Sequence, residues 1–295
     1  MRINKGVLFA AGAYGLWGII PIYFKILHQV PAFQIVAHRV IWSFVFLILL
    51  VAVRRQFPAM RSAITPRTVL IFLISGILLT VNWTVYVWAV NSGFIVEASL
   101  GYFINPLVNV LLGVVFLHEK LRPTQWIPVG LAAIGVAYLT FAHGSLPWIG
   151  LVLAFSFGMY GLIRKIAPLG SLFGLTLETG LILLPALGYL LWQESQSQGA
   201  FGHVGLTLNI LLALAGLVTS IPLLLFASGA RSVPLTTMGL LQYLTPTLQF
   251  LVGIVLYNEA LTPARLIGFS IIWLALIVFS AENLLTRRAP VIQTA

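Results

Sequence analysis

Long apolar runs make up most of this chain, and they limit its possible folds more than any other feature. A run of about 18 or more apolar residues is typical of a membrane-spanning helix, because hydrocarbon forces each backbone N–H and C=O group to bond within its own segment. The sequence predicts an all-α integral membrane protein with ten transmembrane helices, at residues 6–24, 33–53, 69–89, 96–117, 124–141, 147–163, 172–192, 206–227, 235–257 and 263–281.

The composition agrees with a protein embedded in lipid. Of the 295 residues, 60% are hydrophobic and 7% are charged, whereas soluble domains have about 25% charged residues. The net charge of +10 comes from short Lys and Arg clusters between the apolar runs. Such clusters orient membrane helices and give no reason to expect nucleic acid, so the lipid bilayer is the expected environment.

The basic clusters also predict the topology. If the N-terminus is cytoplasmic, 13 of the 16 Lys and Arg residues lie on the cytoplasmic side, in agreement with the positive-inside rule. An even number of helices then places both termini in the cytoplasm. No small-residue cleavage site follows the first apolar run, so we expect an uncleaved helix rather than a signal peptide.

Missing residue types exclude several classes of enzyme. The chain contains no Cys and no Asp, which rules out disulfides, thiol catalysis and thiolate metal sites. None of its four Lys residues follows Gly as in a Walker A motif, and no HExxH or GxSxG motif occurs. We therefore predict that the protein is not an enzyme, hydrolyses no ATP and needs no metal or cofactor.

The chain contains an internal repeat with a shift of 140 residues. Segment 97–121 lies over segment 237–261, and the register extends without a gap on both sides. Self-similarity of this length indicates duplication. It predicts two related halves, with a first repeat at residues 1–142, a second at 147–285 and a cytoplasmic tail at 286–295.

Each half contains five predicted helices. An odd number turns the second half upside down in the membrane relative to the first, so we expect an inverted repeat. Inverted repeats of transporters enclose a binding site near the bilayer midplane, and rocking of one half against the other opens that site to each side in turn. The short linker at residues 143–147 suggests that the halves form one transport domain.

Six segments spread over nearly the whole chain carry a likeness to a known family: WGIIPIYFK from residue 17, HRVIWS from 38, NWTVYVWAVN from 82, EASLGYFINPL from 97, AFSFGMYGLIRK from 154 and QYLTPTLQFL from 242. They closely resemble the RarD-type permeases of the EamA family, in the drug/metabolite transporter superfamily. The resemblance implies two EamA repeats, a bacterial inner-membrane location and export of small metabolites or drugs, with chloramphenicol-type molecules among them. It supplies no agreed coupling residue.

Ionisable side chains within the apolar runs are candidates for substrate binding or gating, because a charge at a helix centre costs roughly 2.5–3.5 kcal/mol on insertion scales. Arg39 follows His38, and Glu97 is expected at a similar depth, where it could pair with Arg39 or help to hold a substrate carboxylate and amine. Glu178 is the equivalent of His38 under the 140-residue shift. His38 could also sense protons. The alternative for each residue is helix packing or snorkelling to the interface.

Aromatic and amide side chains supply the other parts of a pocket for an amphipathic molecule. Tyr102 and Asn105 lie one helical turn apart, and Gln242 and Thr245 occupy the equivalent places in the second half. Internal symmetry therefore points two polar pairs at one cavity, although ordinary packing is the alternative. The complete set of candidates is Trp17, Tyr102, Asn105, Gln242, Tyr243 and Thr245.

Two further pairs are matched by the repeat. Pro106 and Pro246 each remove a backbone hydrogen bond about midway along their helices, which predicts two hinges. Glu119 and Glu259 resemble a catalytic carboxylate pair, but the inverted topology places them on opposite sides of the membrane. Each is expected to cap or tether the helix that follows it.

The sequence thus predicts a secondary transporter that exports small amphipathic molecules by alternating access, with proton exchange as one option. Coupling to protons needs a titrating carboxylate, for which Glu178 and Glu97 are the candidates. An uncoupled facilitator of amino acids or other metabolites is the main alternative, and a lipid scramblase or membrane enzyme is a more distant one. Substrate, direction and oligomeric state stay open.

Overall fold

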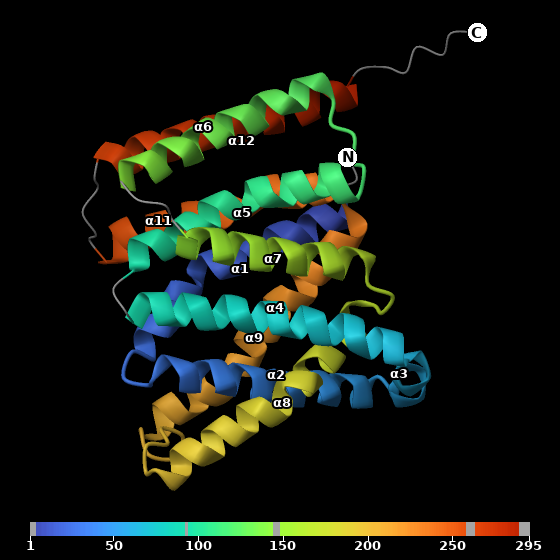
Figure 1. The fold of residues 1–295 in the computed structure, drawn as a ribbon, viewed down its shortest axis with the longest axis vertical. Helices are drawn as coiled ribbons and strands as arrows, with labels where there is room; N and C mark the ends of the chain where they lie inside the picture. Colours follow the sequence, from blue (N-terminus) through green and yellow to red (C-terminus); the bar gives the residue numbers. More distant parts are fainter. Residues whose placement is uncertain (1–3, 92–93, 144–147, 258–262, 289–295) are drawn as a thin grey trace.

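The computed structural model describes residues 4–91, 94–143, 148–257 and 263–288, and for some of these, including residues 95–100, the backbone alone. Within these ranges every regular element is helical (Figure 1), as the sequence predicts. The helices are α1 (Lys5–Ile26), α2 (Ala32–Val53), α3 (Phe57–Ala63), α4 (Pro66–Asn91), α5 (Ile95–Phe116), α6 (Trp126–His143), α7 (Trp148–Ile166), α8 (Ser171–Ser195), α9 (Leu206–Ser232), α10 (Leu235–Gln242), α11 (Leu244–Tyr257) and α12 (Pro263–Arg288), with a 3₁₀ turn η1 (Pro123–Gln125).

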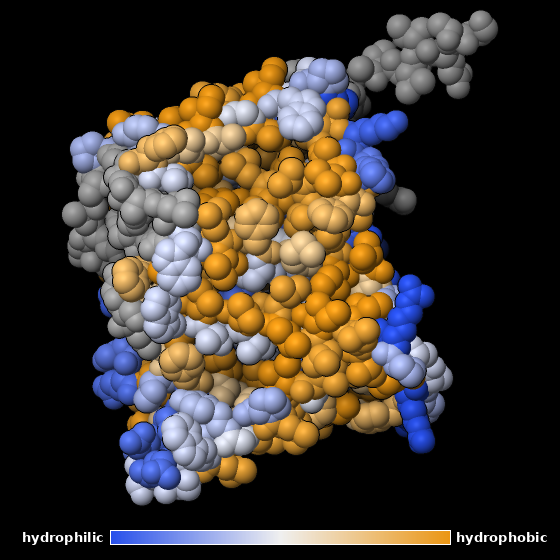
Figure 2. Space-filling view, in the orientation of Figure 1, coloured by the Kyte–Doolittle hydropathy of each residue, from blue (hydrophilic) through white to orange (hydrophobic). Residues whose placement is uncertain are grey.

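Eight helical segments of the described chain are long and apolar enough to cross a membrane. The other two predicted spans coincide with shorter apolar helices, Gly101–Phe116 in α5 and Leu266–Glu282 in α12. In Figure 2 a broad hydrophobic band separates two hydrophilic edges of the molecule. Large apolar side chains stand out from the surface, such as Phe141, which is 83% exposed, and lipid explains their exposure better than water does. The prediction of a multi-pass membrane protein is confirmed. The number of ten membrane-spanning helices stays a prediction.

Helices of the first 143 residues pack mainly against helices of the rest. α1 packs on α9 and α11, α2 on α8 and α9, α4 on α7 and α8, and α5 on α7 and α10. α6 and α12 pair with each other at one end of the molecule (Figure 1). A cluster that includes Phe103, Leu240, Tyr243 and Ile272 joins this pair to α5 and α10. The core therefore lies largely between the two halves of the sequence.

The span predicted at residues 235–257 agrees with one apolar helical segment, Leu235–Leu256, which is interrupted at a single residue, Tyr243. α10 and α11 meet at Tyr243. Pro246 explains the break, because it has no N–H to donate to the carbonyl of Gln242 four residues earlier. The N–H of Tyr243 instead bonds to Leu240, three residues back, at 3.4 Å. Its equivalent Pro106 lies inside an unbroken α5, and action of either proline as a hinge stays a prediction.

Glu119, just after α5, caps a helix other than the one expected. Its carboxylate accepts hydrogen bonds from the backbone N–H groups of Leu235 (2.6 Å) and Thr236 (2.9 Å) at the start of α10, where the helix dipole favours a negative charge. Lys165 Nζ lies 3.8 Å from the same carboxylate. This contact joins segments far apart in the sequence, so the local motif around Glu119 does not encode it. Glu259 lies outside the described residues.

Candidate functional site

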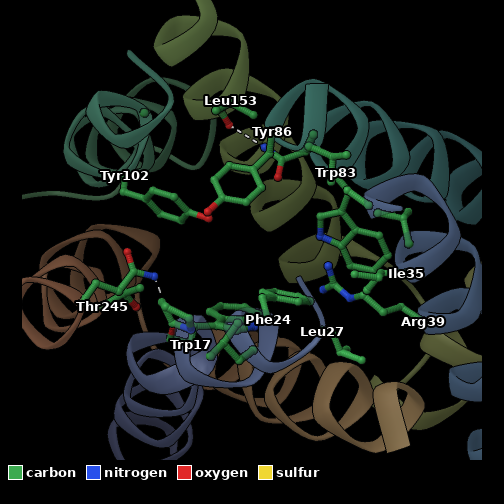
Figure 3. A pocket seen from close by; sticks show the side chains of 18 of the residues that line it. Trp17, Phe24, Leu27, Ile35, Arg39, Trp83, Tyr86, Tyr102, Leu153 and Thr245 are labelled. Carbon is green, nitrogen blue, oxygen red and sulfur yellow. Dashed lines mark hydrogen bonds between the residues drawn. The ribbon is translucent and has the colours of Figure 1, made fainter. Parts of the chain in front are cut away.

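A cavity of about 650 Å³ lies between the helices, within the range of about 300 to 1,000 Å³ that small-molecule sites occupy. Side chains from α1, α2, α4, α5, α7, α9, α10 and α11 line it. It reaches the connection between α1 and α2 at residues 27–32 and extends inward to Asn105 and Gln242. Figure 3 shows the open space that these walls surround.

Aromatic rings form much of the cavity wall. Tyr86 and Tyr102 meet edge to face, with ring centroids 5.8 Å apart. In Figure 3 both hydroxyls point toward the open space. Flat apolar surfaces with a few polar atoms suit an amphipathic ligand. The aromatic lining residues are Trp17, Phe24, Trp83, Tyr86, Tyr102 and Phe157.

Arg39 on α2 is the one Lys or Arg among the described residues that line the cavity. Its guanidinium carbon lies 4.2 Å from the centroid of the Trp83 ring and 5.3 Å from that of Phe24. Its Nε donates a hydrogen bond to the Thr219 hydroxyl at 2.9 Å. Cation–π contacts and one hydrogen bond thus hold a charged group at the edge of the cavity without a described carboxylate beside it.

Amide side chains form the inner end of the cavity. Asn109 Nδ2 donates to Asn105 Oδ1 (3.1 Å) and to Gln242 Oε1 (2.8 Å), so these amides link α5 to α10. Asn105 Nδ2 donates to the carbonyl of Ala154 on α7. The Thr245 hydroxyl donates to the carbonyl of Tyr14 at 2.9 Å. Hydrogen bonds between helices of both halves therefore close this end.

An aromatic cluster lies beyond the amides, toward the side that carries the N-terminus. Tyr14, Tyr160 and Phe226 are completely buried. Phe226 contacts the other two rings and also Trp17 and Phe157, with centroids 5.2–6.1 Å apart. The cluster joins α1, α7 and α9, and Trp17 and Phe157 are also cavity residues. It therefore separates the cavity from the N-terminal side of the molecule.

A buried ion pair lies on this same side. Arg164 Nη1 and Glu178 Oε2 are 3.6 Å apart, and both side chains are almost completely buried. Ser75 on α4 donates to the same carboxylate oxygen at 2.9 Å, and Arg164 Nη2 donates to the carbonyl of Ser171 at 3.2 Å. The pair joins α4, α7 and α8, away from the cavity. Arg164 is therefore buried between helices, although it lies on the same side of the molecule as the N-terminus, as the charge count predicts.

The structure brings six of the ten predicted binding or gating residues to the cavity. His38 instead packs its ring 5.0 Å from that of Phe201. Tyr243 is fully buried and donates its hydroxyl to the carbonyl of Phe103 at 3.2 Å. Glu178 lies in the ion pair, and the side chain of Glu97 lies outside the described part of the chain. The six cavity residues are Trp17, Arg39, Tyr102, Asn105, Gln242 and Thr245.

Some residues of this region were missed from the sequence. Tyr86 lies three residues after Trp83, and Asn109 lies four after Asn105, so helical spacing could have placed each on the face of its neighbour. Arg164 gave no such signal, because a basic residue near the end of an apolar run usually faces the cytoplasm.

Comparisons with known proteins agree with this architecture. The model of the EamA-like transporter family matches residues 4–141. The uncharacterized transporter YojE of Bacillus subtilis is 47% identical over 290 residues, 97% of each chain, and protein RarD of Escherichia coli is 43% identical over 288 residues, again 97% of each. A solved crystal structure shares the fold with a TM-score of 0.73 at 20% identity, over 98% of this chain and 100% of that one. The chain therefore belongs to the EamA-like transporter family, among its RarD-type permeases.

Proposed function

We propose that this permease exports small amphipathic metabolites or drugs across the bacterial inner membrane by alternating access, as a carrier and not an enzyme. The cavity carries the proposal. It reaches one end of the helices at residues 27–32, while amides, packed rings and a buried ion pair lie between its inner end and the other side. One state of an alternating-access carrier requires this arrangement. Chloramphenicol-type drugs are candidate substrates by family resemblance.

The proposed topology has ten spans in two inverted repeats, with both termini cytoplasmic. The ends of α5, α7 and α9 meet the start of α10 on one side, through Glu119 and Lys165. The start of α1 lies on that side as well, because Gly6 packs against Ser232 at the end of α9. The family match to residues 4–141 also supports a first repeat at residues 1–142. The side with the N-terminus is then cytoplasmic, and the cavity opens toward the periplasm.

Three layers would separate when the cavity opens toward the cytoplasm. The first is the amide contact of Asn109 with Gln242, and the second is the aromatic cluster around Phe226. The third contains the ion pair of Arg164 with Glu178. All three connect helices of different repeats, directly or through Ser75, so rocking of one repeat against the other would break them together.

Glu178 is our candidate for coupling to protons. Its charge attracts Arg164 on α7, and its carboxylate accepts a hydrogen bond from Ser75 on α4. Protonation would remove the attraction and so weaken the contact between three helices on the closed side. Glu97 is the second candidate, from its position in the sequence.

The function can be tested in two steps. Untargeted comparison of the metabolites in cells with and without the protein identifies candidate substrates, and uptake of these into inverted membrane vesicles then measures transport. Asn105→Leu, at the inner end of the cavity, should abolish uptake. Gln196→Leu, the same type of change at an exposed position, should leave it intact. Equal uptake by the two variants would show that the substrate does not pass through the cavity.

Two alternatives predict different results in the same vesicles. An uncoupled facilitator of amino acids or other metabolites would equilibrate its substrate but never concentrate it, with or without a pH gradient. A lipid scramblase would move fluorescent phospholipids between leaflets, and a membrane enzyme would convert its substrate. Concentrative uptake of an unchanged small molecule distinguishes the proposed transporter from all three.

A further inference from the structure

We propose that the cavity selects organic anions, and that Arg39 binds the carboxylate of a substrate with an aromatic or similarly planar body. The inference rests on the proposed transport function and narrows its substrate class to carboxylates, so that uncharged chloramphenicol-type drugs would not be the preferred substrates. It depends on three properties of the guanidinium: its unused donors, its fixed orientation and the absence of a carboxylate among the described residues that line the cavity.

Arg39 has hydrogen-bond donors that the protein does not use. Its Nε donates to Thr219, whereas its two terminal nitrogens have no hydrogen-bond partner among the described residues. The side chain lines the cavity, and Figure 3 shows the guanidinium facing the open space. These nitrogens are not among the buried atoms that lack a partner, so they are open to the cavity, where a ligand with acceptor oxygens can bind them.

The orientation of the guanidinium suits a carboxylate. The ring of Trp83, at 4.2 Å, and that of Phe24, at 5.3 Å, restrict its plane, and the bond from Nε to Thr219 fixes its rotation within that plane. The remaining edge presents two parallel N–H groups, which match the two oxygens of a carboxylate. The neighbouring rings continue into the cavity wall, where a planar ligand body can stack.

The charge of the cavity also favours an anion. Neither Asp nor Glu occurs among the described lining residues, and the buried Glu178 is already paired with Arg164. A cation in a low-dielectric site is unfavourable without a counter-charge, and an anionic substrate would supply one. A cationic substrate would instead be repelled by Arg39.

Three probes of similar shape and different charge test this inference: 3-phenylpropanoate, 3-phenylpropanamide and 3-phenylpropylamine. Calorimetry and thermal stabilisation would measure their binding to the purified full-length protein in phosphatidylcholine nanodiscs. We expect the acid to bind about 10- to 100-fold more tightly than the amide, as charged hydrogen bonds allow, and the amine to bind more weakly still. Equal binding of the three probes, or binding of none, would overturn the proposal.

Variants assign the preference to Arg39. Arg39→Gln should reduce affinity for the acid about 10- to 100-fold and leave affinity for the amide unchanged. Arg39→Lys keeps the charge without the paired donors, so it should retain part of the preference. Thr219→Val should also weaken binding of the acid, because it removes the hydrogen bond that orients the guanidinium. If the Arg39→Gln protein does not fold, this variant tests the role of Arg39 instead. The control is Arg54→Gln, at an exposed arginine directly after α2. If this variant also lost the preference for the acid over the amide, the preference would not depend on Arg39.

Two further measurements separate this inference from its alternatives. An anionic lipid headgroup could present the same type of oxygens, so phosphatidylglycerol is added to the nanodiscs; displacement of the acid by the lipid would overturn the proposal. Flux of the three probes into proteoliposomes tests the transport function separately. Binding of the acid without flux would refute transport alone, whereas equal flux of the three probes would refute anion selection alone.

Discussion

Glu178 on α8 and Arg164 on α7 approach within 3.6 Å, with 2% and 0% of their side chains exposed. Ser75 on α4 donates to the same carboxylate, so one charged group fixes three helices on the side where the cavity is closed. A buried ion pair is costly to form, and loss of one partner leaves an uncompensated charge. Control of this pair by a proton would therefore change the packing of the closed side.

Glu178→Gln should abolish transport that a pH gradient drives, because the amide keeps the shape of the side chain but cannot change its charge. Exchange of substrate in the absence of a gradient should persist. Flux into proteoliposomes with and without an imposed gradient measures both. Glu194→Gln, at a carboxylate that is 55% exposed, is the control. Unchanged gradient-driven flux in the Glu178 variant would exclude this residue as the coupling group.

Arg164→Met should lower the free energy of unfolding by about 3 to 5 kcal/mol, because it leaves Glu178 charged and unpaired in the interior. Addition of Glu178→Leu to this variant should recover much of the loss. Thermal unfolding of the purified single and double variants in detergent gives the coupling between the two sites. Additive losses would show that the two residues do not stabilise one another.

Glu119→Ala should lower stability by about 0.5 to 2 kcal/mol, the usual cost of a lost helix cap, because two N–H groups at the start of α10 lose their acceptor. Glu119→Gln keeps an acceptor oxygen and should cost less. Hydrogen exchange locates the effect: the amides of Leu235 and Thr236 should exchange faster in the Ala variant. Exchange that is unchanged at both amides would contradict the capping contact.

Gly216→Ala should destabilise the protein by about 1 to 3 kcal/mol, the typical cost of overpacking. A Cβ atom at this position would overlap with the backbone of Trp42, where α9 packs on α2. Gly188→Ala is the matched change on α8, because a Cβ there meets no atom within 4 Å. That variant should be neutral or more stable by up to about 1 kcal/mol. Equal melting temperatures would argue against the close contact of α2 with α9.

The helical membrane class was predictable because hydropathy is a property of each segment by itself. Asn105 and Gln242 were predictable as cavity residues because amides in apolar helices are costly, and because the repeat places Thr245 opposite Asn105 and Gln242 opposite Tyr102. Contacts between distant segments were not predictable in this way. Glu119 caps α10 and Arg164 pairs with Glu178, and both contacts depend on which helices pack together.

The cavity shows the same limit. Tyr102 and Trp17 were candidates from their type and position, but Tyr243, the equivalent of Phe103, is buried and does not face the cavity. A sequence repeat matches positions along two helices but does not show which face of each helix meets the cavity. Phe103 and Tyr243 pack in the same buried cluster, so the polar aromatic type of Tyr243 was the misleading signal.

Labelling of a single cysteine from each side of the membrane tests the central claim, that the cavity is a carrier site open toward the periplasm. The chain has no Cys, so Gln249→Cys, in the cavity wall, reports on that position alone. Ser228→Cys, near the end of α9, is the control for sidedness. A thiol reagent that cannot cross the membrane should label Gln249→Cys from the periplasmic side, more slowly when a transported substrate is present, and should label Ser228→Cys only from the cytoplasmic side. Labelling of Gln249→Cys at equal rates from both sides, or from neither, would contradict the account.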